Sequence, residues 1–314
     1  MFIRKHILFP SMLIFASANA VENHNPSEWI QVAASDDALE TLKQKAIGKA
    51  ENYVTDETKN FLSPYLNSLE MSVNARDILT GPSYEIIGLK AYDNNGKQNG
   101  YLFNQFGLSH FDKRTTINIG LGYRYLSADE KWLLGANVFY DNEVTYQHTR
   151  AGAGIELKSS IFKLAYNHYD GLSGYKDDVD GTTAKALDGS DVRFDLALPY
   201  LPGAAISYKN FKWIGDAGGD DIKGSEVSLK GKLSSSFHVD TGRTFYDSAT
   251  QKDDSWIKLT YQMNLGETKN EPLLFDFSKD AYQLASIAHE KYKPVQRENR
   301  IIKQKKFSTT VSGN

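Results

Sequence analysis

The sequence predicts an all-β membrane protein: a twelve-stranded antiparallel transmembrane β-barrel with an N-terminal periplasmic helix and a C-terminal helical and extended linker. Three observations predict it. Apolar and polar side chains alternate with a period of two over about two hundred residues. The connections between these runs alternate between short and long. A leader of the secretory type stands at the N-terminus.

Composition narrows the class of protein further. The 314 residues carry a formal net charge of −3, which gives no bulk attraction to nucleic acid, and we predict no nucleic-acid partner. The absence of cysteine excludes disulfides, thiolate zinc sites and thiol nucleophiles. Mean hydropathy is −0.47, and no apolar run long enough for a membrane helix follows the leader. Barrel strands are compatible with this value because their lumen-facing residues are polar.

The N-terminus has the organisation of a signal peptide. A basic cluster at 4–6 precedes an apolar stretch at 7–16, and an A-x-A cleavage signature follows at 18–20. We therefore assign residues 1–20 to a signal peptide and expect export. We assign residues 21–67 to a periplasmic helical segment, because apolar residues recur there at helical spacing.

The strand pattern begins near residue 69 and is clearest at 115–125. There Ile119 and Leu121 share one face while Asn118 and Arg124 share the other. In an outer-membrane barrel the first face contacts lipid and the second lines the lumen. We expect strands near 69–79, 84–92, 101–111, 115–126, 131–141, 148–158, 161–170, 189–199, 203–213, 223–233, 236–246 and 255–265. This even count is typical of bacterial single-chain barrels.

The connections predict the orientation of the barrel. We expect short turns at 128–130, 159–160, 201–203 and 234–235, and longer acidic loops at 142–147, 171–188, 214–222 and 247–254. Outer-membrane barrels have short periplasmic turns and long extracellular loops. A periplasmic N-terminus is consistent with this sorting, and it gives a barrel at 68–266 in the Gram-negative outer membrane.

Charged side chains on the polar face are the candidate site. We expect the pore lining to include Arg124, Asp141, Arg150, Glu156, Lys158, Asp191 and Arg193. The segment at 267–314 should contain a helix at 279–291 and then a basic extended stretch that includes Arg297, Glu298 and Arg300. Two interpretations stay open: the linker pairs with the lumen charges in a plugged pore, or these charges solvate a water-filled lumen.

Several segments resemble the intimin/invasin family, also called inverse autotransporters. They are RTTINIGLGYRYL (114–126), WLLGANVFYDNEVT (132–145), HTRAGAGIELKSSIFKLAYNHYDGLSGYK (148–176), FDLALPYLPG (194–203) and PVQRENRIIKQKK (294–306). The resemblance covers most of the chain beyond the leader. It implies a twelve-stranded outer-membrane translocator whose linker returns through the pore at 267–314. It also implies type V secretion, surface display, cell adhesion and virulence.

The segment after the predicted barrel is shorter than in the family pattern, and this leaves three hypotheses for the function. About fifty residues follow the predicted barrel, whereas an immunoglobulin-like passenger domain needs about 100. We therefore expect a barrel without the adhesive passenger. The alternatives are a passenger-less outer-membrane pore or loop-mediated surface binding protein, and a truncated remnant of a larger adhesin.

The expected partners follow from the same resemblance. They are outer-membrane lipid and lipopolysaccharide, the Sec and barrel-assembly machinery, and a separately encoded adhesin or a host-cell surface. We predict that the protein binds no cofactor or metal and is not an enzyme. His148, His168 and Ser173 lie near predicted strand ends, but the chain has no G-x-S-x-G elbow. Acidic loops leave calcium binding as a minor alternative.

Overall fold

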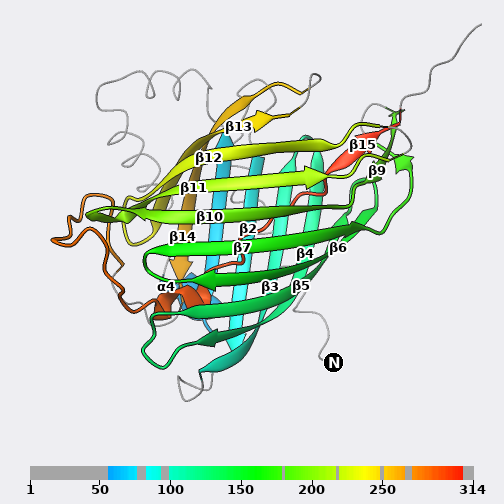
Figure 1. The fold of residues 1–314 in the computed structure, drawn as a ribbon. Helices are drawn as coiled ribbons and strands as arrows, with labels where there is room; N and C mark the ends of the chain where they lie inside the picture. The colour runs from blue at the N-terminus through cyan, green and yellow to red at the C-terminus, as the bar shows by residue number, and fades with distance from the viewer. Residues whose placement is uncertain are drawn as a thin grey trace, which may run out of the picture. The chain divides into compact units, whose positions relative to one another are not determined.

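Twelve strands form one closed antiparallel barrel in the computed structural model (Figure 1). The structure describes residues 56–75, 83–92, 99–178, 181–216, 219–247, 251–265 and 271–306. The predicted signal peptide, and residues 21–55 of the predicted periplasmic segment, lie outside this part of the chain. Within it, no helix has the length and hydropathy to cross a membrane.

The barrel strands follow the chain around the ring, and the last strand pairs with the first. Ser68 lies opposite Asn264 and Ala75 lies opposite Ile257, so the closing pair leaves no open edge. The strands are β1 (Ser68–Ala75), β2 (Ser83–Tyr92), β3 (Gly100–Phe111), β4 (Arg114–Leu126), β5 (Leu133–Glu143), β6 (His148–Lys158), β7 (Phe162–Gly171), β10 (Gly189–Leu198), β11 (Leu201–Trp213), β12 (Ile222–Lys232), β13 (Phe237–Tyr246) and β14 (Asp254–Asn264). The predicted twelve-stranded antiparallel barrel is confirmed.

Alternation places the side chains as the period of two predicts. On β4, Ile119 and Leu121 are 51% and 53% exposed on the outer face, while Asn118 is 1% exposed and faces the lumen. Exposed aromatic residues lie on the outer face near the end of β4, at Tyr123 and Tyr125, and just before β5, at Trp132. The ring centroids of Trp132 and Phe162 lie 5.7 Å apart, and aromatic side chains of this kind are typical of a membrane interface.

Two lumen-facing glycines are required by close packing. A Cβ on Gly120 would lie 2.2 Å from the ring of Phe139, and one on Gly122 would lie 2.8 Å from the carbonyl oxygen of Ala136. Any larger residue at these positions would force neighbouring strands or rings apart.

The two ends of the barrel differ. We call the end with connections 127–132, 159–161, 199–200 and 233–236 the short-turn end, and the end with loops 172–188 and 214–221 the long-loop end. The expected alternation of lengths is wrong between β4 and β6, where the connection at 144–147 is no longer than that at 127–132. Strand β5 ends at Glu143, two residues further toward the long-loop end than expected, whereas β6 begins at His148 as expected.

Among the described residues, five short elements lie outside the barrel wall. Helix α4 (Asp56–Leu62) precedes β1, and the 3-10 helix η2 (Ala288–Tyr292) follows β14. Strands β8 (Lys176–Asp177), β9 (Thr183–Ala186) and β15 (Lys303–Lys305) form a separate sheet in the order β15-β9-β8. Figure 1 shows the C-terminal part in orange at the short-turn end and in red, as β15, at the opposite end.

Candidate functional site

The C-terminal segment first follows the rim of the short-turn end. We call residues 273–286 the strap. The amide of Leu274 donates to the carbonyl oxygen of Lys232, where β12 ends, at 2.7 Å. Tyr200, in the next turn around the ring, receives a bond from the amide of Ser278 at 2.9 Å and donates its own amide to Ala281 at 3.1 Å. The strap therefore docks through its backbone on successive turns.

The strap continues to two further turns. Ser160 Oγ donates to the carbonyl oxygen of Gln283 at 2.8 Å and accepts the amide of Ala285 at 2.9 Å. The amide of Ile287 then donates to the carbonyl oxygen of Glu130 at 2.7 Å. The helix expected at 279–291 is therefore wrong except for η2. The turns of the barrel take the backbone groups that a helix would use, and this outweighs the local propensity.

Residues 287–306, which we call the linker, run from this rim into the lumen. Ile287 is buried against Leu126 and Leu133, and Val295 is buried in a cluster with Leu89 and Phe103. These apolar contacts add to the polar ones because each removes hydrophobic surface from water.

Glu290 lies where the linker enters the lumen and pairs with several lysines. Its carboxylate is buried and lies 2.7 Å from Lys163 Nζ, 3.4 Å from Lys293 Nζ and 3.5 Å from Lys158 Nζ. Lys158 also pairs with Glu156 at 3.0 Å. A buried carboxylate with several cationic partners is stable, whereas the loss of those partners would leave an expensive unpaired charge.

Glu271 forms a second carboxylate centre beside the strap, outside the strands. Lys293 Nζ lies 2.6 Å and Lys232 Nζ 3.0 Å from its Oε2. Burial by itself would raise the pKa of Glu271, but Lys293, His289 and Lys232 lower that pKa to about 2. This carboxylate is therefore ionised at neutral pH and fixes the start of the linker to the end of β12.

Arg124 connects the barrel wall to the linker backbone. Its Nη1 donates to the carbonyl oxygens of Lys291 and Lys293, both at 2.8 Å, and its Nε pairs with Glu156 at 2.5 Å. The guanidinium lies over the ring of Phe103, 4.5 Å from the centroid. These contacts to carbonyl oxygens do not depend on which side chains the linker carries.

Asp141, two residues from the end of β5, pairs with cations of both the wall and the linker. It lies 2.7 Å from Arg150 on the wall and 2.7 Å from Arg297 on the linker, and Asn118 donates to it at 2.6 Å. Arg297 also stacks over Phe139, 4.1 Å from the ring centroid. All three charged side chains are almost fully buried, so each depends on the others for its pairing.

Glu298 and Arg300 lie next along the linker. Glu298 Oε1 accepts Arg300 Nε at 2.8 Å, and Lys209 Nζ lies 3.3 Å from Oε2. The amide of Glu298 donates to Tyr169 Oη at 2.8 Å, and its carbonyl oxygen accepts Arg150 Nη2 at 2.6 Å. Wall and linker are thus joined through side chains and backbone together.

Asp191 and Arg193 lie on the same inner wall but do not contact the linker directly. Asp191 accepts hydrogen bonds from Tyr169 Oη at 2.7 Å and from Asn167 at 3.0 Å. Arg193 is half-buried and interacts electrostatically with Glu226, Asp195 and Asp191. Asp191 therefore orients Tyr169, which in turn contacts the linker.

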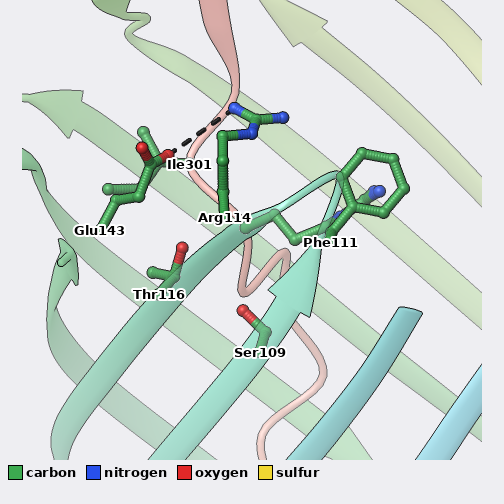
Figure 2. A pocket seen from close by; sticks show the side chains of 7 residues that line it. Ser109, Phe111, Arg114, Thr116, Glu143 and Ile301 are labelled. Atoms are coloured by element: carbon green, nitrogen blue, oxygen red, sulfur yellow. Dashed lines mark ion pairs between the residues drawn. The ribbon is translucent and has the colours of Figure 1, made fainter. Parts of the chain in front are cut away.

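A small pocket opens beside the linker near the long-loop end (Figure 2). Arg114 points toward Glu143, at 3.6 Å, and Glu143 also pairs with Lys303 of the linker at 3.0 Å. The pocket is lined by Ser109, Phe111, Arg114, Thr116, Glu143, Arg300 and Ile301.

Three contact residues were missed from sequence. Glu143, Lys163 and Tyr169 touch the linker or its ion pairs. Glu143 is in phase with Asp141 on β5, and Lys163 and Tyr169 are in phase with Asn167 on β7, so the period of two could have included all three. Asn118, which the alternation placed on the lumen face, also donates to the linker backbone.

The three residues weighed for catalysis are not gathered into one site. His148 Nδ1 lies 3.2 Å from Ser173 Oγ, whereas His168 is exposed and pairs with Asp170 at 3.3 Å. A triad also needs a carboxylate or amide on the second ring nitrogen of the histidine, and no described residue bonds His148 Nε2. Among the described residues, no three His, Cys, Asp or Glu side chains are placed to hold a metal ion.

The matching protein family agrees with this geometry. The family model described as "Inverse autotransporter, beta-domain" matches residues 17–299. A solved membrane-protein structure, from a study of in-meso crystallization, superposes with a TM-score of 0.61 at 21% identity. It covers 77% of this chain and 100% of its own. At that identity the likeness supports the fold alone.

Curated relatives carry the family's names. The chain is 34% identical over 135 residues to the "Putative attaching and effacing protein homolog" of Escherichia coli K12, which covers 42% of each chain. It is 31% identical over 176 residues to intimin of Escherichia coli O127:H6, covering 54% of this chain and 18% of that one. Invasin of Yersinia enterocolitica is 26% identical over 199 residues, covering 61% of this chain and 21% of that one.

The matches therefore span less than half the length of each of these relatives. The family model, in contrast, spans most of this chain and coincides with the barrel and the lumen part of the linker. Barrel closure, an aromatic outer face and a polar lumen are the properties of a Gram-negative outer-membrane protein. The chain belongs to the inverse autotransporter beta-domain family, the barrel family of the intimins and invasins.

Proposed function

We propose that this barrel anchors the chain in the outer membrane and is the route by which its own C-terminal segment reaches the cell surface. One observation carries the proposal. The linker is bonded to Glu130 at the short-turn end and to β9 at the long-loop end, so a single segment runs the whole length of the lumen. A chain that occupies both mouths of a pore has the placement expected of exported polypeptide.

The direction of export follows from the ends of the barrel. Short turns face the periplasm in outer-membrane barrels, and long loops face outward. Residues beyond 306 would then continue on the cell surface. The names of the relatives, an invasin and an attaching and effacing homolog, support a role in adhesion and virulence for what is displayed.

The partners proposed for this role are those of any exported barrel. Sec would carry the chain across the inner membrane, and the barrel-assembly machinery would insert it among outer-membrane lipid and lipopolysaccharide. A separately encoded adhesin or a host-cell surface would be the external partner. We propose no catalytic role, since His148 and Ser173 pair without a bonded carboxylate on the histidine.

Surface digestion of intact cells tests the proposal. An epitope tag fused after Asn314 should be removed by external protease, while a tag in the periplasmic segment before β1 should be cleaved only after the outer membrane is permeabilised. Resistance of the barrel to SDS at room temperature serves as the folding control. A C-terminal tag that stays protected in correctly folded barrels would overturn export.

Single-channel recording separates this function from that of an open pore. The lumen is occupied by the linker, so we expect little conductance in the intact protein and steady conductance after deletion of 288–306. A barrel that conducts equally with and without the linker would be a passenger-less pore rather than a translocator.

A further inference from the structure

The loop between β7 and β10 offers a strand edge at the long-loop mouth. Strand β9 pairs on one side with β8, where Lys176 lies opposite Ala184, and on the other with β15. Figure 1 shows β15 beside β9 at this end of the barrel. The linker therefore completes a sheet that the loop has begun.

The barrel wall contacts the end of β9 independently of the linker. The amide of Gly171, at the end of β7, donates to Asp188 Oδ1 at 2.8 Å. The backbones approach so closely there that a Cβ on Gly171 would lie 2.3 Å from the carbonyl oxygen of Ala186. Because β9 is anchored on this side, its other edge is available in advance, which lowers the ordering cost of binding.

Recognition along this edge uses the backbone. The amide of Leu187 donates to the carbonyl oxygen of Ile302 at 3.0 Å, and the amide of Lys306 donates to that of Thr183 at 2.8 Å. In an antiparallel ladder, hydrogen-bonded pairs recur at every second residue. Gln304 and Lys185 are directly opposite and therefore form the hydrogen-bonded pair between these two bonds. Such bonds give affinity without requiring particular side chains.

The side chains impose few further requirements. On β9, Ala184 and Ala186 present only methyl groups, and on the linker Lys305 and Lys306 are exposed. Two linker side chains are anchored: Lys303 Nζ lies 3.0 Å from Glu143 and 2.7 Å from Asp178, and Gln304 Oε1 accepts the amide of Asp216 at 2.7 Å. Beyond Gln304 the edge would accept most residues other than proline, which lacks the donor.

We propose that the β9 edge is a docking site for extended polypeptide, which captures the chain as it emerges from the pore by adding it as a strand. Capture outside the pore opposes backward sliding, so it favours outward movement. This inference rests on the proposed export function, but the docking itself is measured separately.

The test uses proline variants of the full-length chain in a background that has no native cysteine. Directly opposite residues of a hydrogen-bonded pair lie about 5.5 Å apart between Cα atoms, within disulfide range. A chain carrying Lys185→Cys and Gln304→Cys should therefore cross-link. Adding Lys306→Pro removes the bond to Thr183 and should lower the yield about fivefold. Lys305→Pro is the matched control, because the amide of Lys305 points away from β9 and the yield should stay near that of the parent.

Side-chain tolerance is tested in the same background. Replacing both Lys305 and Lys306 by threonine should leave the cross-link yield within about twofold, since the ladder is kept. Equal yields from the two proline variants, or a threonine variant as poor as Lys306→Pro, would overturn docking through the backbone.

The rate at which a tag after Asn314 reaches the surface then tests capture. We expect slower exposure in Lys306→Pro than in Lys305→Pro, and equal rates would overturn a role of docking in export. If the tag of the parent never reaches the surface, the proposed function fails, while the cross-link still reports whether β9 binds the chain.

Discussion

Asp141 on β5 accepts both terminal nitrogens of Arg297 on the linker, with Nη1–Oδ1 at 2.8 Å and Nη2–Oδ2 at 2.7 Å. The same carboxylate accepts Arg150 Nε at 2.8 Å from the neighbouring strand. One anion therefore holds a wall cation and a linker cation together inside the pore. A bidentate contact of this kind is both stronger and more specific than a single charge-assisted bond.

Neutralising Asp141 should loosen the linker. Asp141→Asn leaves two buried guanidinium groups without their anion, and breaking a buried pair in this way costs about 3–5 kcal/mol. We expect a lower urea midpoint for the barrel in detergent and frequent channel openings in planar bilayers. Asp170→Asn is the control, because Asp170 lies on β7 with its side chain 63% exposed. Identical behaviour of the two variants would contradict a central role for Asp141.

The apolar contact of Ile287 with Leu126 and Leu133 should hold the linker where it enters the lumen. Ile287→Asp would place a charge in the buried cluster with Leu126 and Leu133, at a cost of several kcal/mol, because a buried charge without a partner is strongly unfavourable. Trypsin on the periplasmic side should then cleave at the basic linker residues. Leu284→Asp, at a position that is 39% exposed, should leave cleavage unchanged, and cleavage of both variants alike would refute this role.

Gly122 should tolerate no side chain. A Cβ there would lie 2.3 Å from the ring of Phe103 and 2.8 Å from a backbone oxygen, and overpacking of this kind costs about 1–3 kcal/mol. We expect Gly122→Ala to lower the urea midpoint and the yield of SDS-resistant barrel. Gly174→Ala is matched to it, since nothing lies within 4 Å of the added carbon, and it should behave as the parent.

Acid should release the start of the linker. The pKa of Glu271 is lowered to about 2 from an ordinary value of 4.5, so its contribution to stability is complete above pH 4.5 and is lost as the pH falls toward 2. Conductance should therefore rise over that interval in the parent. In Glu271→Gln the carboxylate contribution is absent at every pH, so this part of the acid response should disappear. A Gln variant with the parent's full acid response would show that another group controls release.

The sequence predicted the barrel wall well because its signal is local. In a strand that separates lipid from water, apolar and polar side chains must alternate. The faces of Ile119 and Asn118 can therefore be assigned from the neighbouring residues alone. The same phase was the basis for predicting the pore-lining charges. Their partners could not be assigned, since the pairing of Asp141 with Arg297 joins residues far apart in the chain.

The elements that were missed depend on contacts that no local period records. Strand β15 exists because Lys303–Lys305 emerges beside β9, and not because of its own composition. Similarly, small residues at helical spacing predicted a helix at 279–291, yet Tyr200 and Ser160 bond Ala281, Gln283 and Ala285 individually. Tertiary hydrogen bonds here outweigh a weak intrinsic preference.

The strap and linker make the C-terminal segment a ligand that is tethered to its own receptor. Binding within one chain proceeds at an effective concentration that reaches the millimolar range for short tethers. Occupancy of the lumen is then independent of how many copies the membrane holds, and a free peptide would need comparable concentrations to compete. Because such a ligand binds only the folded barrel, part of the measured stability of the wall is the affinity of the tail that fills it.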